Sequence, residues 1–233
     1  MTLSEKFIDY YNKIESYLKR TENYVSEVSF TQKIKNAKNA VVIRYRDELL
    51  VFGELRNAIV HNPRIDDRTI AEPHEKIVEQ IEELHKKITN PLKVIPKFQF
   101  PVLGAKEDEH INEIFIEMKK KSFSQFPIFN KEDTVCELIN TNTVSRWLSS
   151  NLEEKGTIII ENVKVKDLIK EIEFKNNYKF ISRNTSIYDA HNLFIKQINT
   201  NRRNLDVLFI TETGKSTEKL LGLITIEDIA NMV

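Results

Sequence analysis

Thr225 and Asp228 could together hold a phosphorylated sugar. Thr225 ends an apolar run that predicts a strand, and Asp228 lies in the first turn of the helix expected after it. A hydroxyl and the backbone N–H groups at a helix start can hold phosphate oxygens, while a carboxylate can accept both hydroxyls of a ribose. Threonine and aspartate at these positions also cap helices, so ligand binding and plain capping both remain open.

Arg56, Asn57 and His61 form a second group, at the end of another expected helix. An arginine can neutralise a phosphate, and a histidine that titrates near neutrality can move a proton. Five helical positions separate Arg56 and His61 by about 140° beyond one full turn. We therefore expect the helix to loosen over 60–62, as Pro63 favours, before both side chains face one pocket. A histidine is also favoured at a helix C-terminus by the macrodipole alone.

The elements that position Thr225 and Asp228 belong to an internal repeat, which predicts a β-α-β-β-α unit present twice. The first copy runs from Phe98 to Leu148, and the second begins near Thr157. Expected in the first copy are strands 98–103, 126–129 and 134–140 and helices 110–120 and 143–148. Expected in the second are strands 179–182, 206–211 and 220–225 and helices 187–198 and 227–232.

Residues 221–229 resemble the end of a CBS repeat: a glycine, two hydrophobic residues, a hydroxyl, two variable residues, an aspartate and a hydrophobic residue. Residues 123–130 resemble the second strand of that family, with its proline. The resemblance implies a tandem CBS pair that senses an adenosine ligand such as AMP, ATP, a cyclic dinucleotide or S-adenosylmethionine. It implies no other cofactor.

The same resemblance implies roles for particular residues. Thr225 would hold phosphate and Asp228 the ribose, with the base packed between strands. Because paired repeats share each cleft, Phe123 and Ser124 would form its far wall. Arg203, which precedes a second strand, would contact phosphate, although an exposed arginine is more often simply solvated.

The two clefts are expected to differ. Superposing the repeat endings places Asn140 opposite Thr225 and Thr143 opposite Asp228. A threonine makes one ordinary hydrogen bond to a ribose diol, whereas a carboxylate accepts two charge-assisted ones. We therefore expect one competent adenosine site per chain.

The first ninety residues predict a stack of four helices, beginning near Thr2, over 30–40, at Ala40 and at Glu72-Pro73. With Arg56, Asn57 and His61 at the end of the third helix, this segment resembles HEPN domains. That resemblance implies a homodimer whose two chains share a metal-free ribonuclease pocket. Three interpretations remain open: an active ribonuclease, a HEPN-like domain used only for dimerisation or partner binding, and an unrelated helical bundle.

Composition narrows the partners. The 35 basic and 35 acidic residues balance, so any RNA contact must be local, and we expect no DNA partner. The single cysteine, Cys136, excludes an intramolecular disulfide and a cysteine-rich metal site, and we expect no metal. No apolar run approaches the roughly 18 residues of a membrane span, and the N-terminus lacks a signal-peptide pattern. We expect a cytoplasmic protein without a membrane partner.

The sequence thus predicts an α+β protein with a HEPN-like helical bundle over 1–90, a linker over 91–97, and CBS repeats over 98–150 and 151–233. The predicted function is adenosine-responsive regulation of the helical domain, which would be the effector. The alternatives are a non-catalytic dimerising adaptor and a binding module that regulates a separate partner.

Overall fold

The computed structural model describes residues 1–25, 27–62, 69, 71–156, 162–201 and 203–233. The chain divides into two compact units, Met1–Leu92 and Lys93–Val233, and each is described by itself.

The N-terminal unit is helical throughout its described elements. These are α1 (Leu3–Thr21), α2 (Phe30–Asn36), α3 (Ala40–Arg44), α4 (Arg46–His61) and α5 (Glu75–Thr89). Thr2 caps α1 in a reciprocal arrangement: its hydroxyl accepts from the Glu5 backbone N–H at 3.1 Å, and the Glu5 carboxylate accepts from the Thr2 N–H at 2.7 Å. Such a capping box satisfies N–H groups that the helix itself leaves unpaired.

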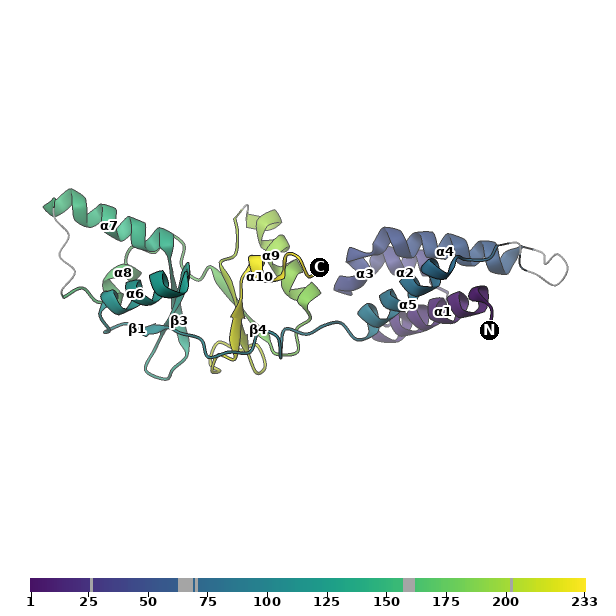
Figure 1. Ribbon diagram of the computed structural model, residues 1–233, viewed down its shortest axis with the longest axis horizontal. Helices are drawn as coiled ribbons and strands as arrows, with labels where there is room; N and C mark the ends of the chain where they lie inside the picture. Colours follow the sequence, from purple (N-terminus) through teal and green to yellow (C-terminus); the bar gives the residue numbers. More distant parts are fainter. Residues whose placement is uncertain (26, 63–68, 70, 157–161, 202) are drawn as a thin grey trace. The chain divides into compact units, whose positions relative to one another are not determined.

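The core of this unit lies where α1 packs along α5 and against α4 (Figure 1). Phe7 and Phe52 meet edge to face, with ring centroids 5.7 Å apart. Ile14, Leu18 and Ile81 are fully buried beside them. Their three- and four-residue spacing places them on one face of each helix, so the sequence pattern located this core.

The expected single helix from Ala40 to Val60 is in fact two. Tyr45 leaves helical geometry, with φ −104° and ψ 28°, and separates α3 from α4. Asn39 caps α3, its side-chain oxygen accepting from the N–H groups of Val41 and Val42. No proline or glycine stands near Tyr45, so the apolar pattern continues across the break. The last helix likewise begins later than expected, at Glu75.

The C-terminal unit contains two three-stranded sheets of the same design. The first copy has β1 (Ala105–Lys106), α6 (Ile111–Lys121), β2 (Gln125–Phe129), β3 (Val135–Asn140) and α7 (Thr141–Lys155). The second has α8 (Val165–Ile169), β4 (Tyr178–Ser182), α9 (Ile187–Asn201), β5 (Val207–Thr211), β6 (Gly222–Ile224) and α10 (Ile226–Ile229). In each sheet the first two strands pair parallel and the last two antiparallel. The predicted internal repeat is therefore confirmed, as is the mixed α+β class.

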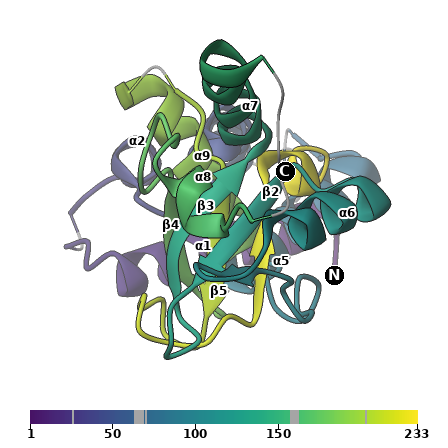
Figure 2. The ribbon, with the colours of Figure 1, turned by 90° about the vertical axis from the view of Figure 1, so that its left-hand side faces the viewer.

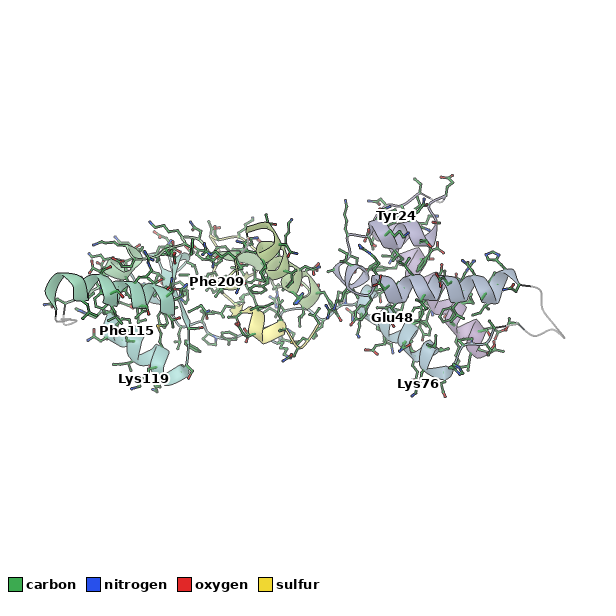
Figure 3. The ribbon with its side chains drawn as sticks, turned by 90° about the horizontal axis from the view of Figure 1, so that it is seen from above. Tyr24, Glu48, Lys76, Phe115, Lys119 and Phe209 are labelled. Carbon is green, nitrogen blue, oxygen red and sulfur yellow. The ribbon has the colours of Figure 1, made fainter. Side chains whose placement is uncertain are left out.

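Helices cover both sheets. In the first copy, α6 and α7 both pack against β2 and β3 (Figure 2), and Ile114 of α6 and Trp147 of α7 belong to one apolar cluster with Ile128. The Trp147 ring lies near that of Phe115 of α6. In the second copy, α9 and α10 lie together over the sheet (Figure 1). A separate apolar cluster joins the copies, because Val135 and Leu138 of β3 pack with Val207 and Phe209 of β5. Phe209 lies within the interior of the unit (Figure 3).

Residues 93–103 differ from the expected linker and strand. Val94, Ile95 and Phe98 are buried in the core of the second repeat. The Val94 N–H donates to the Thr185 carbonyl at 2.9 Å. This stretch is thus part of the C-terminal unit and not a spacer. The first strand also begins later than the expected 98–103: β1 pairs with β2 through Ala105 and Lys106.

Two further differences concern helices. The helix α7 continues to Lys155, past the expected end at Leu148, and α8 was not predicted. The expected start of the second repeat, near Thr157, lies outside the described residues.

Candidate functional site

A cleft of about 780 Å³ lies in the C-terminal unit. Three stretches of chain line it: the segment that enters the first repeat, the turn between α6 and β2, and the end of β6 with the start of α10. The lining residues are Phe98, 100–103, 121–125, Leu223, Thr225, Glu227 and Asp228. The volume is in the range of small-molecule pockets, and a mostly apolar wall with a few polar groups is typical of them.

Thr225 and Asp228 contact each other at one end of this cleft. Thr225 is the N-cap of α10 and Asp228 lies three residues into it. One oxygen of the Asp228 carboxylate, Oδ2, accepts from the Thr225 N–H at 2.7 Å and from its hydroxyl at 2.9 Å. The capping role expected as the alternative is therefore present. A carboxylate has about four acceptor positions, so capping does not exhaust Asp228.

Phe123 and Ser124 lie on the same cleft although they are a hundred residues away in sequence. Ser122 adopts a left-handed conformation at φ 56°, which ends α6 and turns the chain into β2. Phe123 is 41% exposed there. The hydroxyl of Ser124 contacts the side chain of Gln125 at 2.7 Å. The structure thus brings four of the five expected ligand-binding residues to one cleft.

Arg203 is the fifth, and it lies elsewhere. Its guanidinium carbon stands 3.4 Å from the centroid of the Phe174 ring, and Arg203 is not among the residues that line the cleft. Lys121 takes the expected place of a basic residue. Both stand four positions before a second strand, Lys121 before β2 and Arg203 before β5. This cleft combines β6, the third strand of the second repeat, with β2, the second strand of the first repeat. The basic residue four positions before the second strand is therefore to be sought in the first repeat, where it is Lys121.

At the pseudo-equivalent position in the first repeat, the polar side chains are hydrogen-bonded to one another and to residues of the second repeat. Asn140, the N-cap of α7, donates from its amide to the Asp206 carboxylate at 3.2 Å. Thr143 is 2% exposed and its hydroxyl donates to the Asn140 side chain at 3.0 Å. The Asn142 amide donates to Glu173 at 3.0 Å. Residues that precede β4 and β5 are therefore already hydrogen-bonded to Asn140 and Asn142, which correspond to Thr225 and Glu227.

Residues 164–233 match the family model of the CBS domain. The match covers the second repeat, which contains Thr225 and Asp228. The first repeat has the same strand order and pairing as this CBS domain, and the N-cap residues of their closing helices, Asn140 and Thr225, correspond.

No curated protein matches the chain. Among solved structures, the CBS domain pair of protein MJ0100, in complex with 5′-methylthioadenosine and S-adenosyl-L-methionine, is 17% identical over 61% of this chain and 95% of that one, with a TM-score of 0.44. Protein MJ1225 from Methanocaldococcus jannaschii is 14% identical over 77% of this chain and 63% of its own, with a TM-score of 0.46. CBSX2 in complex with AMP is 13% identical over 58% of this chain and 92% of that one, with a TM-score of 0.40. At these values the similarity does not extend to residue roles.

In the N-terminal unit, Arg56 and His61 do come together. A guanidinium nitrogen of Arg56, Nη1, lies 3.0 Å from His61 Nε2 and 3.3 Å from the side-chain oxygen of Asn57. The helix α4 continues through His61 and the chain leaves helical geometry at Asn62, with φ −88° and ψ 147°. Of the loosening expected over 60–62, only that at Asn62 is present. The long arginine side chain spans the angle instead.

Arg56 is held against the α1 side of the unit. Its guanidinium lies 5.7 Å from the centroid of the Tyr11 ring, and its Nε is buried without a hydrogen-bond partner among the described residues. Burial raises the pKa of the Tyr11 hydroxyl, Glu15 raises it further, and Arg56 opposes them. Pro63, which was expected to end the helix, lies outside the described residues.

Two absences hold for the described part of the chain. It contains no group of three or more His, Cys, Asp or Glu side chains placed to hold a metal ion. None of its helices is long and apolar enough to span a membrane.

Proposed function

We propose that the C-terminal unit is a tandem CBS pair that binds one adenosine ligand per chain at the Thr225–Asp228 cleft, and that this binding regulates the N-terminal unit. The observation that carries the proposal is the cleft itself. It joins Thr225 and Asp228 of the matched CBS domain to Phe123 and Ser124 of the first repeat.

The chemistry of the lining suits an adenosine. The carboxylate of Asp228 can accept the two hydroxyls of a ribose, and charge-assisted bonds of this kind are roughly twice as strong as neutral ones. The Thr225 hydroxyl can turn toward a ligand oxygen. Phe98, Phe100 and Phe123 offer apolar faces for a purine, which aromatic side chains stack well. In the first repeat, the bond between Asn140 and Asp206 supports a single site.

Titration calorimetry with adenosine ligands tests this. We expect a stoichiometry near one ligand per chain. Asp228→Asn keeps a helix-capping side chain but removes the charge, and should weaken binding about ten- to a hundredfold. Thr143→Ala is the matched control in the first repeat and should leave binding unchanged. Two equal sites, or binding that withstands Asp228→Asn, would contradict the assignment.

A second function is favoured by the contact between Arg56 and His61. In a HEPN-like homodimer these residues would carry out metal-independent RNA cleavage, with Arg56 neutralising the phosphate and His61 transferring the proton. The alternative is that the helical unit is an adaptor that only dimerises or binds a partner.

The variant His61→Ala separates these alternatives. His61 is exposed at the end of α4, so the variant should melt within a degree or two of the wild type, as surface substitutions do. It should lose any RNA cleavage that the wild type shows. Wild-type protein that cleaves no RNA with or without adenosine ligands would favour the adaptor, and a monomer in sedimentation would remove the composite pocket.

A further inference from the structure

The Thr225–Asp228 cleft carries an excess of negative charge. Of the described residues that line it, three are charged: Lys121, Glu227 and Asp228. The other lining side chains are apolar or neutral and include three phenylalanines. The guanidinium of Arg203, which the sequence suggested as a phosphate contact, lies against Phe174 instead. One positive and two negative groups therefore face any occupant.

The two acidic groups are adjacent in α10 and cannot both be neutralised by Lys121. Glu227 and Asp228 occupy the first turn of this short helix. Among the described residues, Asp228 accepts hydrogen bonds from the N–H and hydroxyl of Thr225, both neutral groups. Neither acid forms a salt bridge within the part of the chain that the structure describes. Lys121, Glu227 and Asp228 are all exposed, so their effect on a charged ligand is largest at low ionic strength, where salt screens it least.

We infer that this cleft selects adenosine ligands that carry no net negative charge, either neutral thioether nucleosides or sulfonium cations, over nucleotides with phosphate groups. The inference rests on the proposed adenosine function and narrows it. A phosphate would add negative charge beside Glu227 and Asp228, with one lysine to offset it. An apolar 5′ substituent meets apolar side chains instead, and a sulfonium is attracted both by the acids and by the faces of the phenylalanine rings.

The aromatic lining gives the second half of the argument. Phe100 and Phe123 are 43% and 41% exposed, and Leu103 is 41% exposed. These are large apolar side chains at the mouth of one cleft. A triphosphate would lose hydration against these apolar side chains, with few polar groups such as Lys121 and Thr225 to replace it, which is unfavourable. A methylthio group would instead remove the apolar side chains from water.

Calorimetry with four probes tests the inference: adenosine, 5′-methylthioadenosine, S-adenosylmethionine and AMP. At low salt, AMP should bind about tenfold or more weakly than 5′-methylthioadenosine, and added salt should narrow the gap because it screens the repulsion. AMP binding as tightly as the thioether would overturn the inference and leave the proposed function standing. No binding by any of the four would overturn both.

Two variants shift the charge in opposite directions. Glu227→Lys should raise the affinity for AMP relative to 5′-methylthioadenosine about tenfold, and Lys121→Gln should lower the same ratio. Both side chains are exposed, so the fold should survive, and the melting temperature verifies it. The matched control is Glu132→Lys, which makes the same charge change in the loop at the far end of β2 and should leave the ratio unchanged. A ratio that does not respond to either cleft variant would also overturn the inference.

Discussion

Gly222 lies where the chain that enters the C-terminal unit crosses β6. A β-carbon at this position would stand 1.8 Å from the Phe98 carbonyl oxygen, and that oxygen belongs to backbone that cannot rotate away. The Phe100 N–H donates to the Leu221 carbonyl at 3.1 Å beside it. The glycine of the 221–229 motif is therefore required by a close approach of two backbone segments.

This gives a prediction with a built-in control. Gly222→Ala should destabilise the protein by about 1–3 kcal/mol, because the segment at Phe98 must shift. Gly53→Ala in α4 makes the same chemical change, but its β-carbon would lie 3.4 Å from the Phe30 ring, an ordinary contact. There the helix gains about 1 kcal/mol from replacing glycine. Denaturant unfolding of the two variants should give opposite signs, and equal destabilisation would contradict this account.

At the scale of single residues, the sequence predicted four residues that line the cleft but not the basic residue among them. Thr225, Asp228, Phe123 and Ser124 could be identified because each belongs to a short local motif. Lys121 was missed because the position before a second strand was considered in the second repeat, at Arg203, and not in the first repeat, whose residues line this cleft. The side-chain packing of β3 against β5, which joins the repeats, is a contact between residues far apart in sequence, and no local pattern predicts it.

At the scale of elements, the loop between β5 and β6 is held by one carboxylate. Glu218 accepts from the Thr213 hydroxyl at 2.6 Å and from the Thr213 N–H at 2.7 Å. These bonds, the hydroxyl first, lower the pKa of Glu218 from 4.5 to about 2. A carboxylate whose pKa is lower in the folded than in the unfolded state stabilises the folded state at pH values above its unfolded-state pKa. This stabilisation is lost as the pH falls through the folded-state pKa.

We therefore expect Glu218→Gln to lower the free energy of unfolding at pH 7, with the difference from wild type shrinking as the pH falls from 4.5 toward 2. Unfolding in denaturant at a series of pH values measures this. Thr213→Val removes the hydroxyl donor, so its difference from wild type in unfolding free energy should also shrink as the pH falls from 4.5 toward 2. A difference that stays constant across the pH range would show that the carboxylate charge is not what holds the loop.

Helices and strands were predicted correctly where buried residues recur with the regular spacing of a helix or of a strand. The predictions failed at elements whose start or end does not alter that spacing. Residues 98–103 are apolar enough for a strand, but the described backbone N–H groups there donate to Val94, Pro96 and Leu221, so the segment does not form a regular strand ladder. The break at Tyr45 leaves the apolar spacing intact. Neither feature changes hydrophobic periodicity, which is the main signal that a single sequence offers.

At the scale of the whole molecule, the described residues form two units with separate cores, and the boundary between them has consequences for fragments. A fragment of residues 93–233 keeps Val94, Ile95 and Phe98 in the core of the second repeat. A fragment of residues 99–233 loses all three. Each buried side chain of this kind contributes about 1.5–3 kcal/mol, and most domains have only about 5–15 kcal/mol in total.

The shorter fragment should therefore melt far below the longer one or fail to fold, as circular dichroism during heating would record. Equal melting temperatures would mean that the segment only rests on the surface. The longer fragment also provides the control for ligand binding, because it retains Phe98, which lines the cleft.

The segment that follows Leu92 has a mechanical consequence. Tension applied to the chain at Leu92 is borne first by the bond from Val94 to Thr185 and then by the bond from Phe100 to Leu221. Both anchor the chain to the second repeat, although the sequence leads next to the first. Between the two anchors lies Phe98, on the wall of the cleft. A pull on Leu92 would therefore reach the wall of the Thr225–Asp228 cleft within a few residues. Under the proposed function, a ligand in contact with Phe98 would stiffen the segment between the two anchors.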